Sequence, residues 1–403
     1  MKKYDVIIVG AGPGGSTAAY YLAKAGLGVC LVDKQSFPRD KICGDGIISA
    51  CLKQLDKIGL TDWITEKGFN APNRLLLSSP GGQFVEIMPH DPNFCYGKII
   101  PRLELDNAIL GQALNAGADL LEDVKLTELT RPTKDTVCVV GTQKKHKPPL
   151  KLTSNLLFSA DGAHASFTRR LGLVKTIPDL VAVRAYFEDV EGSEAVWEIH
   201  YDRAIQPGYA WLFPLTNKRA NVGLGTYASR SRQKHLNFKH TLQQFINNNP
   251  RAKKRLGQAK MIGSLKGYPL RTRMDSVISV DDNILVVGEA AGLVNPVNGE
   301  GIGPAMVSGE LAANQANLAF ASGDFSKSQL KGYANALQSH IGRNHTVARF
   351  LQWLLSFPRV MDRTIQRAST DAQFAYILYE VITEVKSPYA VLKPDLLLKF
   401  LRG

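Results

Sequence analysis

Cysteine is scarce in this sequence, and long apolar runs are missing from it. The cysteines are scattered: Cys30, Cys43, Cys51, Cys95 and Cys138. Since their number is odd and no Cys-x-x-Cys pair occurs, we predict neither a disulfide framework nor a metal site. Apolar stretches such as Phe350–Leu355 fall well short of the roughly 18–20 residues that span a bilayer. Together with an N-terminus too short for a signal peptide, these features predict a cytoplasmic protein.

Charge of one sign is in excess. The 403 residues include 49 Lys and Arg against 36 Asp and Glu, a net charge of +13. Such an excess favours phosphates, anionic lipid surfaces or nucleic acid, or serves solubility alone. No zinc-finger spacing, basic heptad or aromatic RNA-binding signature is present, so we expect no nucleic-acid partner. The length predicts more than one domain.

The first residues predict a βαβ unit. Val6–Val9 is a β-branched run typical of a strand buried on both faces, Gly14–Ala25 has helical spacing, and Gly28–Asp33 returns as a second strand. Between the first strand and the helix, the glycine turn Gly10–Gly15 has the pattern G-x-G-x-x-G. This order of elements is that of a dinucleotide-binding fold.

Each glycine of that pattern has a physical role. Gly10 allows the tight turn, Gly12 lets the backbone approach a pyrophosphate, and Gly15 lets helix and strand pack closely. Asp33, at the end of the second strand, is placed to accept hydrogen bonds from ribose hydroxyls. The predicted cofactor-binding residues here are Gly10, Gly12, Pro13, Gly14, Gly15, Asp33 and Lys34. The pattern alone does not separate FAD from NAD.

Two later segments each place an acid–glycine turn after a buried strand. They are Ser159–Ser166 and Ile284–Gly292. With them the chain resembles the flavoprotein superfamily of p-hydroxybenzoate hydroxylase-like enzymes, flavin-dependent halogenases and geranylgeranyl reductases. The resemblance implies an FAD cofactor, whose binding region Asp161 and Gly162 support. It implies that Gly288, Glu289 and Ala290 lie along the ribityl chain and that Arg102 lies near the diphosphate or ribose. The family usually has Asp where this chain has Glu289.

A glycine-rich loop, Gly299–Pro304, precedes a long helical segment. Such a loop can aim backbone N–H groups and a helix dipole at the N1–C2 carbonyl edge of a flavin. Gly299, Gly301 and Ile302 are therefore candidates for cofactor binding. A simple turn at a helix start is the alternative.

Two runs resemble the geranylgeranyl-reductase branch. In Phe37–Asp45 the resemblance puts Cys43, with Gly44, near the isoalloxazine, while Arg39 and Lys41 are expected to face the FAD phosphates. In Gly208–Pro214, strand alternation puts Tyr209, Trp211 and Phe213 on one face, an aromatic wall for an isoprenoid chain. The candidate catalytic residues are Cys43, Tyr209, Trp211 and Phe213. An inert half-buried cysteine and ordinary sheet packing are the alternatives.

The expected fold is α/β. A glutathione-reductase-like, Rossmann-type FAD-binding domain carries an inserted antiparallel β-sheet substrate domain and a C-terminal helical segment. We expect residues 1–70, 100–175 and 276–330 in the FAD-binding domain, and residues 71–99 and 176–275 in the β-rich domain. Residues 331–403 are expected to be helical. Ile47–Ile58 and Arg102–Ala116 predict further helices.

The expected function is FAD-dependent reduction of isolated C=C bonds in a geranylgeranyl or polyprenyl substrate. Since no second glycine fingerprint occurs, we expect NADPH, NADH or an electron-donor protein to reduce the flavin transiently. The alternatives are a monooxygenase or halogenase, in which reduced flavin reacts with O2, and a non-catalytic escort protein that binds prenyl lipids. Ala348–Leu355 is apolar with basic neighbours, which fits peripheral contact with anionic lipid or a helix packed on the core.

Overall fold

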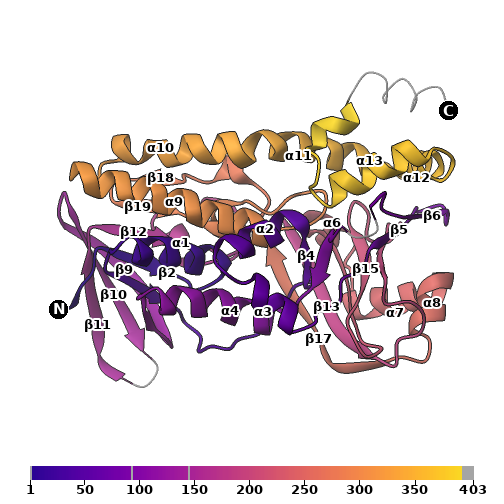
Figure 1. Cartoon of the computed structure of the whole chain (residues 1–403), viewed down its shortest axis with the longest axis horizontal. Helices are drawn as coiled ribbons and strands as arrows, with labels where there is room; N and C mark the ends of the chain where they lie inside the picture. The colour runs from indigo at the N-terminus through magenta and orange to yellow at the C-terminus, as the bar shows by residue number, and fades with distance from the viewer. Residues whose placement is uncertain (1, 92–93, 144–145, 393–403) are drawn as a thin grey trace.

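The computed structural model describes residues 2–91, 94–143 and 146–392 (Figure 1). A six-stranded sheet lies toward the N-terminal side of the molecule and a seven-stranded sheet toward the other side. Helices from the C-terminal third run along the top of both sheets. The mixed α/β fold expected from the sequence is confirmed.

The six-stranded sheet is built around the predicted βαβ unit. Its strands, in spatial order, are β18 (Val280–Asp281), β19 (Ile284–Val286), β12 (Leu156–Ser159), β2 (Val6–Val9), β3 (Val29–Val32) and β8 (Asp119–Leu121). All neighbours are parallel except β18 and β19. The strands β2, β3 and β12 are buried throughout, as their β-branched composition predicts. Helices α1 (Pro13–Lys24) and α9 (Ile302–Ser322) pack together beside this sheet.

A four-stranded sheet lies at the N-terminal end. Its order is β1 (Lys2–Lys3), β11 (His146–Ser154), β10 (Thr136–Gln143) and β9 (Val124–Thr133). Helix α4 spans Arg102–Asn115, close to its predicted bounds. The other predicted helix starts later than expected: α2 is Ser49–Lys57, because Gly46–Ile48 forms strand β4 against β7 (Gly97–Ile99).

The seven-stranded sheet joins two distant parts of the sequence. Its order is β17 (Lys260–Leu270), β13 (Leu180–Glu188), β16 (Ala220–Tyr227), β15 (Tyr209–Pro214), β14 (Val196–His200), β5 (Arg74–Ser78) and β6 (Phe84–Ile87). Pairing is antiparallel except between β14 and β5. The helices α6 (Ala228–Gln233), α7 (Phe238–Asn248) and α8 (Pro250–Leu256) come between β16 and β17. The exact domain boundaries remain a prediction.

The C-terminal segment is helical as far as it is described, and residues 393–403 of the predicted helical region lie outside the described residues. It comprises α10 (Lys327–Leu337), a π-helical turn, α11 (Arg343–Leu355), α12 (Pro358–Thr370) and α13 (Ala372–Ile382). Side chains of α12 and α13, among them Met361 and Tyr379, pack against β5 and β14 in one core cluster. Within the described ranges, no helix has both the length and the apolarity needed to cross a bilayer.

Candidate cofactor and substrate site

One cavity of about 770 Å³ brings the predicted site residues together. That volume lies within the roughly 300–1,000 Å³ typical of small-molecule sites. Its lining includes Gly10, Gly12, Pro13, Gly14, Gly15, Asp33, Lys34, Arg39, Cys43, Gly44, Arg102, Asp161, Gly162, Tyr209, Trp211, Phe213, Gly288, Glu289, Gly299, Gly301 and Ile302. Ala290 is the exception among the predicted residues, since it is fully buried in the core around the six-stranded sheet.

The glycine turn at one end of the cavity shows why three glycines are needed. A Cβ on Gly10, whose φ is 103°, would lie 2.4 Å from the carbonyl oxygen of Ala160. A Cβ on Gly15 would lie 2.0 Å from the carbonyl oxygen of Gly10. At Gly12 the nearest atom is Nη2 of Arg39, at 3.6 Å, so the protein itself leaves room for a side chain there. Gly10 and Gly15 therefore serve packing, whereas Gly12 keeps a surface of the cavity bare.

Asp33 holds this turn in place. It is buried at the end of β3, where its carboxylate accepts hydrogen bonds from the backbone N–H groups of Ala11 and Gln35, both at 2.9 Å. Carboxylate oxygens have two lone pairs each, so Asp33 can still accept a hydrogen bond from a ligand hydroxyl. Asp161, at the end of β12, has a comparable local role, because it accepts a hydrogen bond from the N–H of Phe167 at 2.7 Å.

Two arginines share one carboxylate at the cavity wall. Arg102 donates from Nε and Nη2 to Asp106, at 2.6 and 2.8 Å, and Arg39 lies 3.1 Å from the same carboxylate. Burial favours the neutral carboxyl, but Arg102 and then Arg39 hold the pKa of Asp106 below its usual range. Two guanidinium groups against one carboxylate leave a net positive charge, which suits the phosphates of a dinucleotide.

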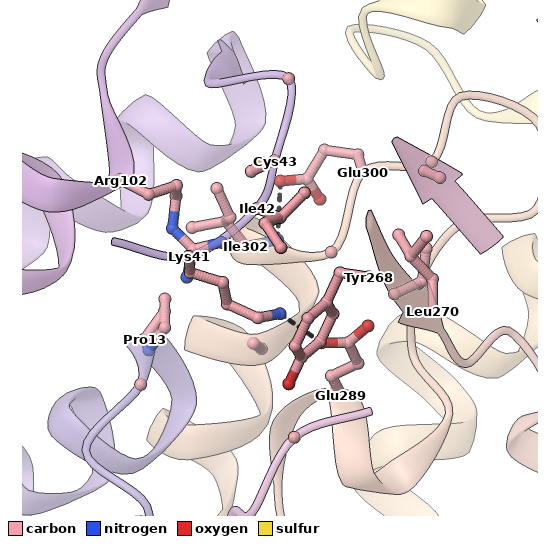
Figure 2. Close-up of a pocket in the computed structure, with 18 of the residues that line it drawn as sticks. Pro13, Lys41, Ile42, Cys43, Arg102, Tyr268, Leu270, Glu289, Glu300 and Ile302 are labelled. Atoms are coloured by element: carbon pink, nitrogen blue, oxygen red, sulfur yellow. Dashed lines mark hydrogen bonds and ion pairs between the residues drawn. The ribbon is translucent and has the colours of Figure 1, made fainter. Parts of the chain in front are cut away.

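Lys41 and Glu289 form an ion pair across the cavity, as Figure 2 shows. Nζ of Lys41 lies 2.7 Å from Oε2 of Glu289 and also lies over the ring of Tyr268, at 4.7 Å from its centroid. Glu289 belongs to the short 3-10 helix η2 (Gly288–Ala291) that follows β19. The charge of Lys41, expected to face phosphates, is thus balanced by Glu289 in the protein itself.

The segment that carries Cys43 is fixed to the seven-stranded sheet. Asn221 of β16 donates from Nδ2 to the carbonyl oxygen of Cys43 and to Asp45, both at 2.8 Å. The hydroxyl of Tyr186 on β13 donates to the same carboxylate at 2.5 Å. Burial raises the pKa of Asp45 to about 6 and also raises the pKa of the Cys43 thiol. Cys43 is therefore a neutral thiol at neutral pH.

The aromatic wall lies at the other end of the cavity. The ring centroids of Tyr209 and Trp211 are 6.1 Å apart, and those of Trp211 and Phe213 are 6.3 Å apart. Nε1 of Trp211 donates to Asn221 at 3.0 Å, and the Tyr209 hydroxyl donates to the carbonyl oxygen of Asn298 at 2.5 Å. Because these polar atoms bond to protein, the rings offer apolar faces to the cavity.

Other lining residues were not predicted. Trp197 and Ile199 come from β14, Tyr268 from β17, and Tyr379 and Ile382 from α13. Apolar and polar residues alternate around Trp197, a pattern that predicts a strand and carries no signal for a site. The remaining residues carry no local motif.

The Gly299–Pro304 loop lines the cavity, but its backbone N–H groups bond differently from what the sequence predicts. Oε1 of Glu300 accepts hydrogen bonds from the N–H groups of Ile302 and Gly303, at 3.0 and 2.8 Å. The first amides of α9, expected to point at a ligand, are thus capped by the protein's own side chain. Oε2 of Glu300 is buried and has no hydrogen-bond partner within the described part of the chain. Burial, and then the carboxylate of Glu384, raise the pKa of Glu300 to about 8.

Comparisons with known proteins support a flavin cofactor for this cavity. Residues 3–333 match the family described as "FAD binding domain". The chain is 32% identical to a menaquinone reductase of Mycobacterium tuberculosis, over 89% of this chain and 86% of that protein. It is 31% identical to a digeranylgeranylglycerophospholipid reductase of Methanoculleus marisnigri, over 87% of this chain and 86% of that protein.

Solved structures share the fold across the whole length. A geranylgeranyl bacteriochlorophyll reductase-like protein of Thermoplasma acidophilum superposes with a TM-score of 0.82 at 23% identity, covering 98% of this chain and 99% of that one. A flavin-dependent brominase superposes with a TM-score of 0.79 at 18% identity, covering 100% of both chains. At these identities the likeness shows the fold alone.

Proposed function

This chain belongs to the geranylgeranyl reductase family of FAD-dependent oxidoreductases, and from that premise we propose that it reduces isolated C=C bonds in a polyprenyl lipid. Two compounds in the names of its relatives, menaquinone and digeranylgeranylglycerophospholipid, both carry polyprenyl chains. Because the relatives differ in the head group of the lipid, the proposal concerns the polyprenyl chain alone.

The residues of the cavity fit FAD. Gly12 leaves bare backbone at the turn where a Cβ would otherwise stand. Arg39 and Arg102 with Asp106 provide a net positive wall for a diphosphate, and Asp33 offers carboxylate oxygens to a ribose. When bound, FAD supplies the two electrons of the reduction, which NADPH, NADH or an electron-donor protein replenishes.

The single observation that supports prenyl reduction is that the cavity runs without interruption from the glycine turn to the aromatic wall. An isoprenoid chain is apolar and flexible, and Tyr209, Trp211 and Phe213 would bind it along their ring faces. An isolated C=C bond accepts hydride poorly unless a proton adds to one of its carbons, so that positive charge develops on the carbon that receives the hydride. The negative π faces of the wall stabilise such charge.

The segment that carries Cys43 packs against the aromatic wall through Gly44, while the Cys43 side chain itself lies against the core cluster of Ile302 and Met306. Gly44 next to it is so close to the rings that a Cβ there would lie 3.1 Å from Phe213 and 3.3 Å from Nε1 of Trp211. A neutral thiol at this place is small and weakly polar, so it packs against a prenyl chain without bringing charge to the reacting carbons. We therefore assign Cys43 to substrate positioning beside the wall.

The test is a reduction assay with dithionite-reduced holoprotein and a panel of lipids that includes geranylgeranyl lipids and menaquinone. Mass spectrometry should show a gain of one H2 for each double bond reduced. No gain across the panel would reject the proposal, and oxygen incorporated into a substrate would favour a monooxygenase. A colourless protein that carries prenyl lipid would favour the escort function.

Two substitutions at Trp211 isolate the role of the ring face. Trp211→Phe and Trp211→Leu both remove the hydrogen bond from Nε1 to Asn221, but only leucine removes the aromatic face. Stabilisation of cationic character by an aromatic ring is worth about 0.5–2 kcal/mol, so Trp211→Leu should be roughly 2- to 30-fold slower than Trp211→Phe. Equal rates for the two variants would remove the wall from the reaction.

A further inference from the structure

Helix α11 and the start of α12 present three large aromatic side chains to solvent. Phe350, Trp353 and Phe357 are 49%, 56% and 45% exposed. They contact one another, with ring centroids 6.0 Å apart for Phe350 and Trp353 and 5.3 Å apart for Trp353 and Phe357. The opposite face of α11 is anchored in the protein by Val347 and Leu351, which are buried. We call the three exposed rings the aromatic ridge.

Arginines flank the aromatic ridge. Residues 343–370 contain five arginines and a single acidic residue, Asp362. Of the arginines, Arg343, Arg349, Arg359 and Arg363 are exposed, and Arg349 also pairs with Asp275 at 3.0 Å. Asp362 accepts a hydrogen bond from the N–H of Gly81 at 2.7 Å and so is turned toward the loop between β5 and β6. The field around the ridge is therefore positive.

We propose that the aromatic ridge and its arginines dock the protein onto an anionic lipid bilayer. Tryptophan and phenylalanine side chains partition into the headgroup region, and arginines next to them are attracted by anionic headgroups. A second copy of this chain would have to bring a surface of the same positive charge against this one, which would repel it. Figure 1 shows α11 and α12 on the outer, upper side of the molecule, where they can meet a flat surface.

The ridge is connected to the apolar end of the cavity. Nε2 of Gln206 donates to the carbonyl oxygen of Leu355, the last residue of α11, at 3.5 Å, and Pro207 and Gly208 line the cavity. Leu355 also packs against the core cluster that contains Trp197, another lining residue. A bilayer on the ridge would thus lie next to the part of the cavity assigned to the prenyl chain. This step rests on the proposed function, whereas the docking itself does not.

The test is sedimentation of the full-length holoprotein with vesicles of phosphatidylcholine, with and without phosphatidylglycerol. We expect binding to the anionic vesicles that salt weakens. The double variant Phe350→Ser/Trp353→Ser should bind at least about tenfold more weakly, because it removes most of the apolar area of the ridge. Arg359→Glu/Arg363→Glu should lose the preference for phosphatidylglycerol. Leu114→Ser, at an exposed leucine on α4, is the matched control and should bind like the wild type.

Several outcomes would overturn the proposal. Absence of vesicle binding would do so, and so would a ridge variant that binds like the wild type. If light scattering showed that the ridge variant converts a dimer to a monomer while vesicle binding is unchanged, the surface would belong to a second copy. Loss of binding only after deletion of residues 393–403 would assign the contact to that segment. No substrate turns over in this assay, so its failure is distinct from failure of the proposed function.

Discussion

Replacement of Glu300 by glutamine should make the protein more stable at alkaline pH. Glu300 is 8% exposed, and burial together with Glu384 raises its pKa to about 8 from 4.5. Because the folded state holds the proton more tightly than the unfolded state, the carboxyl costs no stability below about pH 4.5. The cost grows as the pH rises toward the folded pKa and is constant above it.

The size of the effect follows from these two pKa values. At about 1.4 kcal/mol per pKa unit, the full cost above the folded pKa is about 5 kcal/mol, and roughly half of it is added between about pH 6 and pH 9. For a chain of 403 residues, 1 kcal/mol shifts Tm by about 1 °C. Wild-type Tm should therefore fall by about 3 °C more than that of Glu300→Gln over this range.

The assay is thermal unfolding of holoprotein followed by circular dichroism at both pH values. Glutamine keeps the side-chain oxygen that accepts from Ile302 and Gly303, so the cap of α9 is preserved. Glu66→Gln, at an exposed position on α3 (Thr61–Glu66), is the control and should follow the wild type. Superimposable pH profiles for wild type and Glu300→Gln would refute the assignment of a buried, protonated carboxyl.

Three further predictions concern the cavity. Gly12→Ala should fold with the wild-type Tm in the FAD-free form yet purify colourless, and a yellow Gly12→Ala protein would contradict this. Gly15→Ala should fail to fold, because its Cβ would lie 2.0 Å from the backbone carbonyl oxygen of Gly10. Asp106→Ala leaves the buried guanidinium group of Arg102 and the partly buried one of Arg39 without this carboxylate, and it should cost about 3–5 kcal/mol, measured by chemical denaturation. A cost below about 1 kcal/mol would be inconsistent with the buried pair of Arg102 and Asp106. Iodoacetamide at neutral pH should alkylate exposed Cys95 well before Cys43, whose pKa is raised by burial; peptide mass spectrometry that found equal rates would contradict this.

The sequence predicted the local features of the site. The glycine turn between β2 and α1 was predictable because its strand, turn and helix are consecutive in the sequence. Each glycine is required either by a close backbone contact or by the cavity. The aromatic alternation in β15 was predictable for the same reason, since neighbouring side chains of a strand point to opposite faces wherever the strand lies. Cofactor class and fold needed no more than these runs and their resemblance to a known family.

Tertiary structure decided which groups meet. Glu289 pairs with Lys41 across 248 positions of sequence, and Asn221 reaches Cys43 across 178. Glu300 accepts hydrogen bonds from the first N–H groups of α9, which were expected to face the flavin, and Ala290 packs into the core instead of lining the cavity. Periodicity and turn chemistry report only on backbone conformation and burial within one element, because they arise from contacts a few residues apart. Partners from different elements have no such periodic signal, and their charges and hydrogen bonds are set only when the two sheets and the C-terminal helices pack around one cavity.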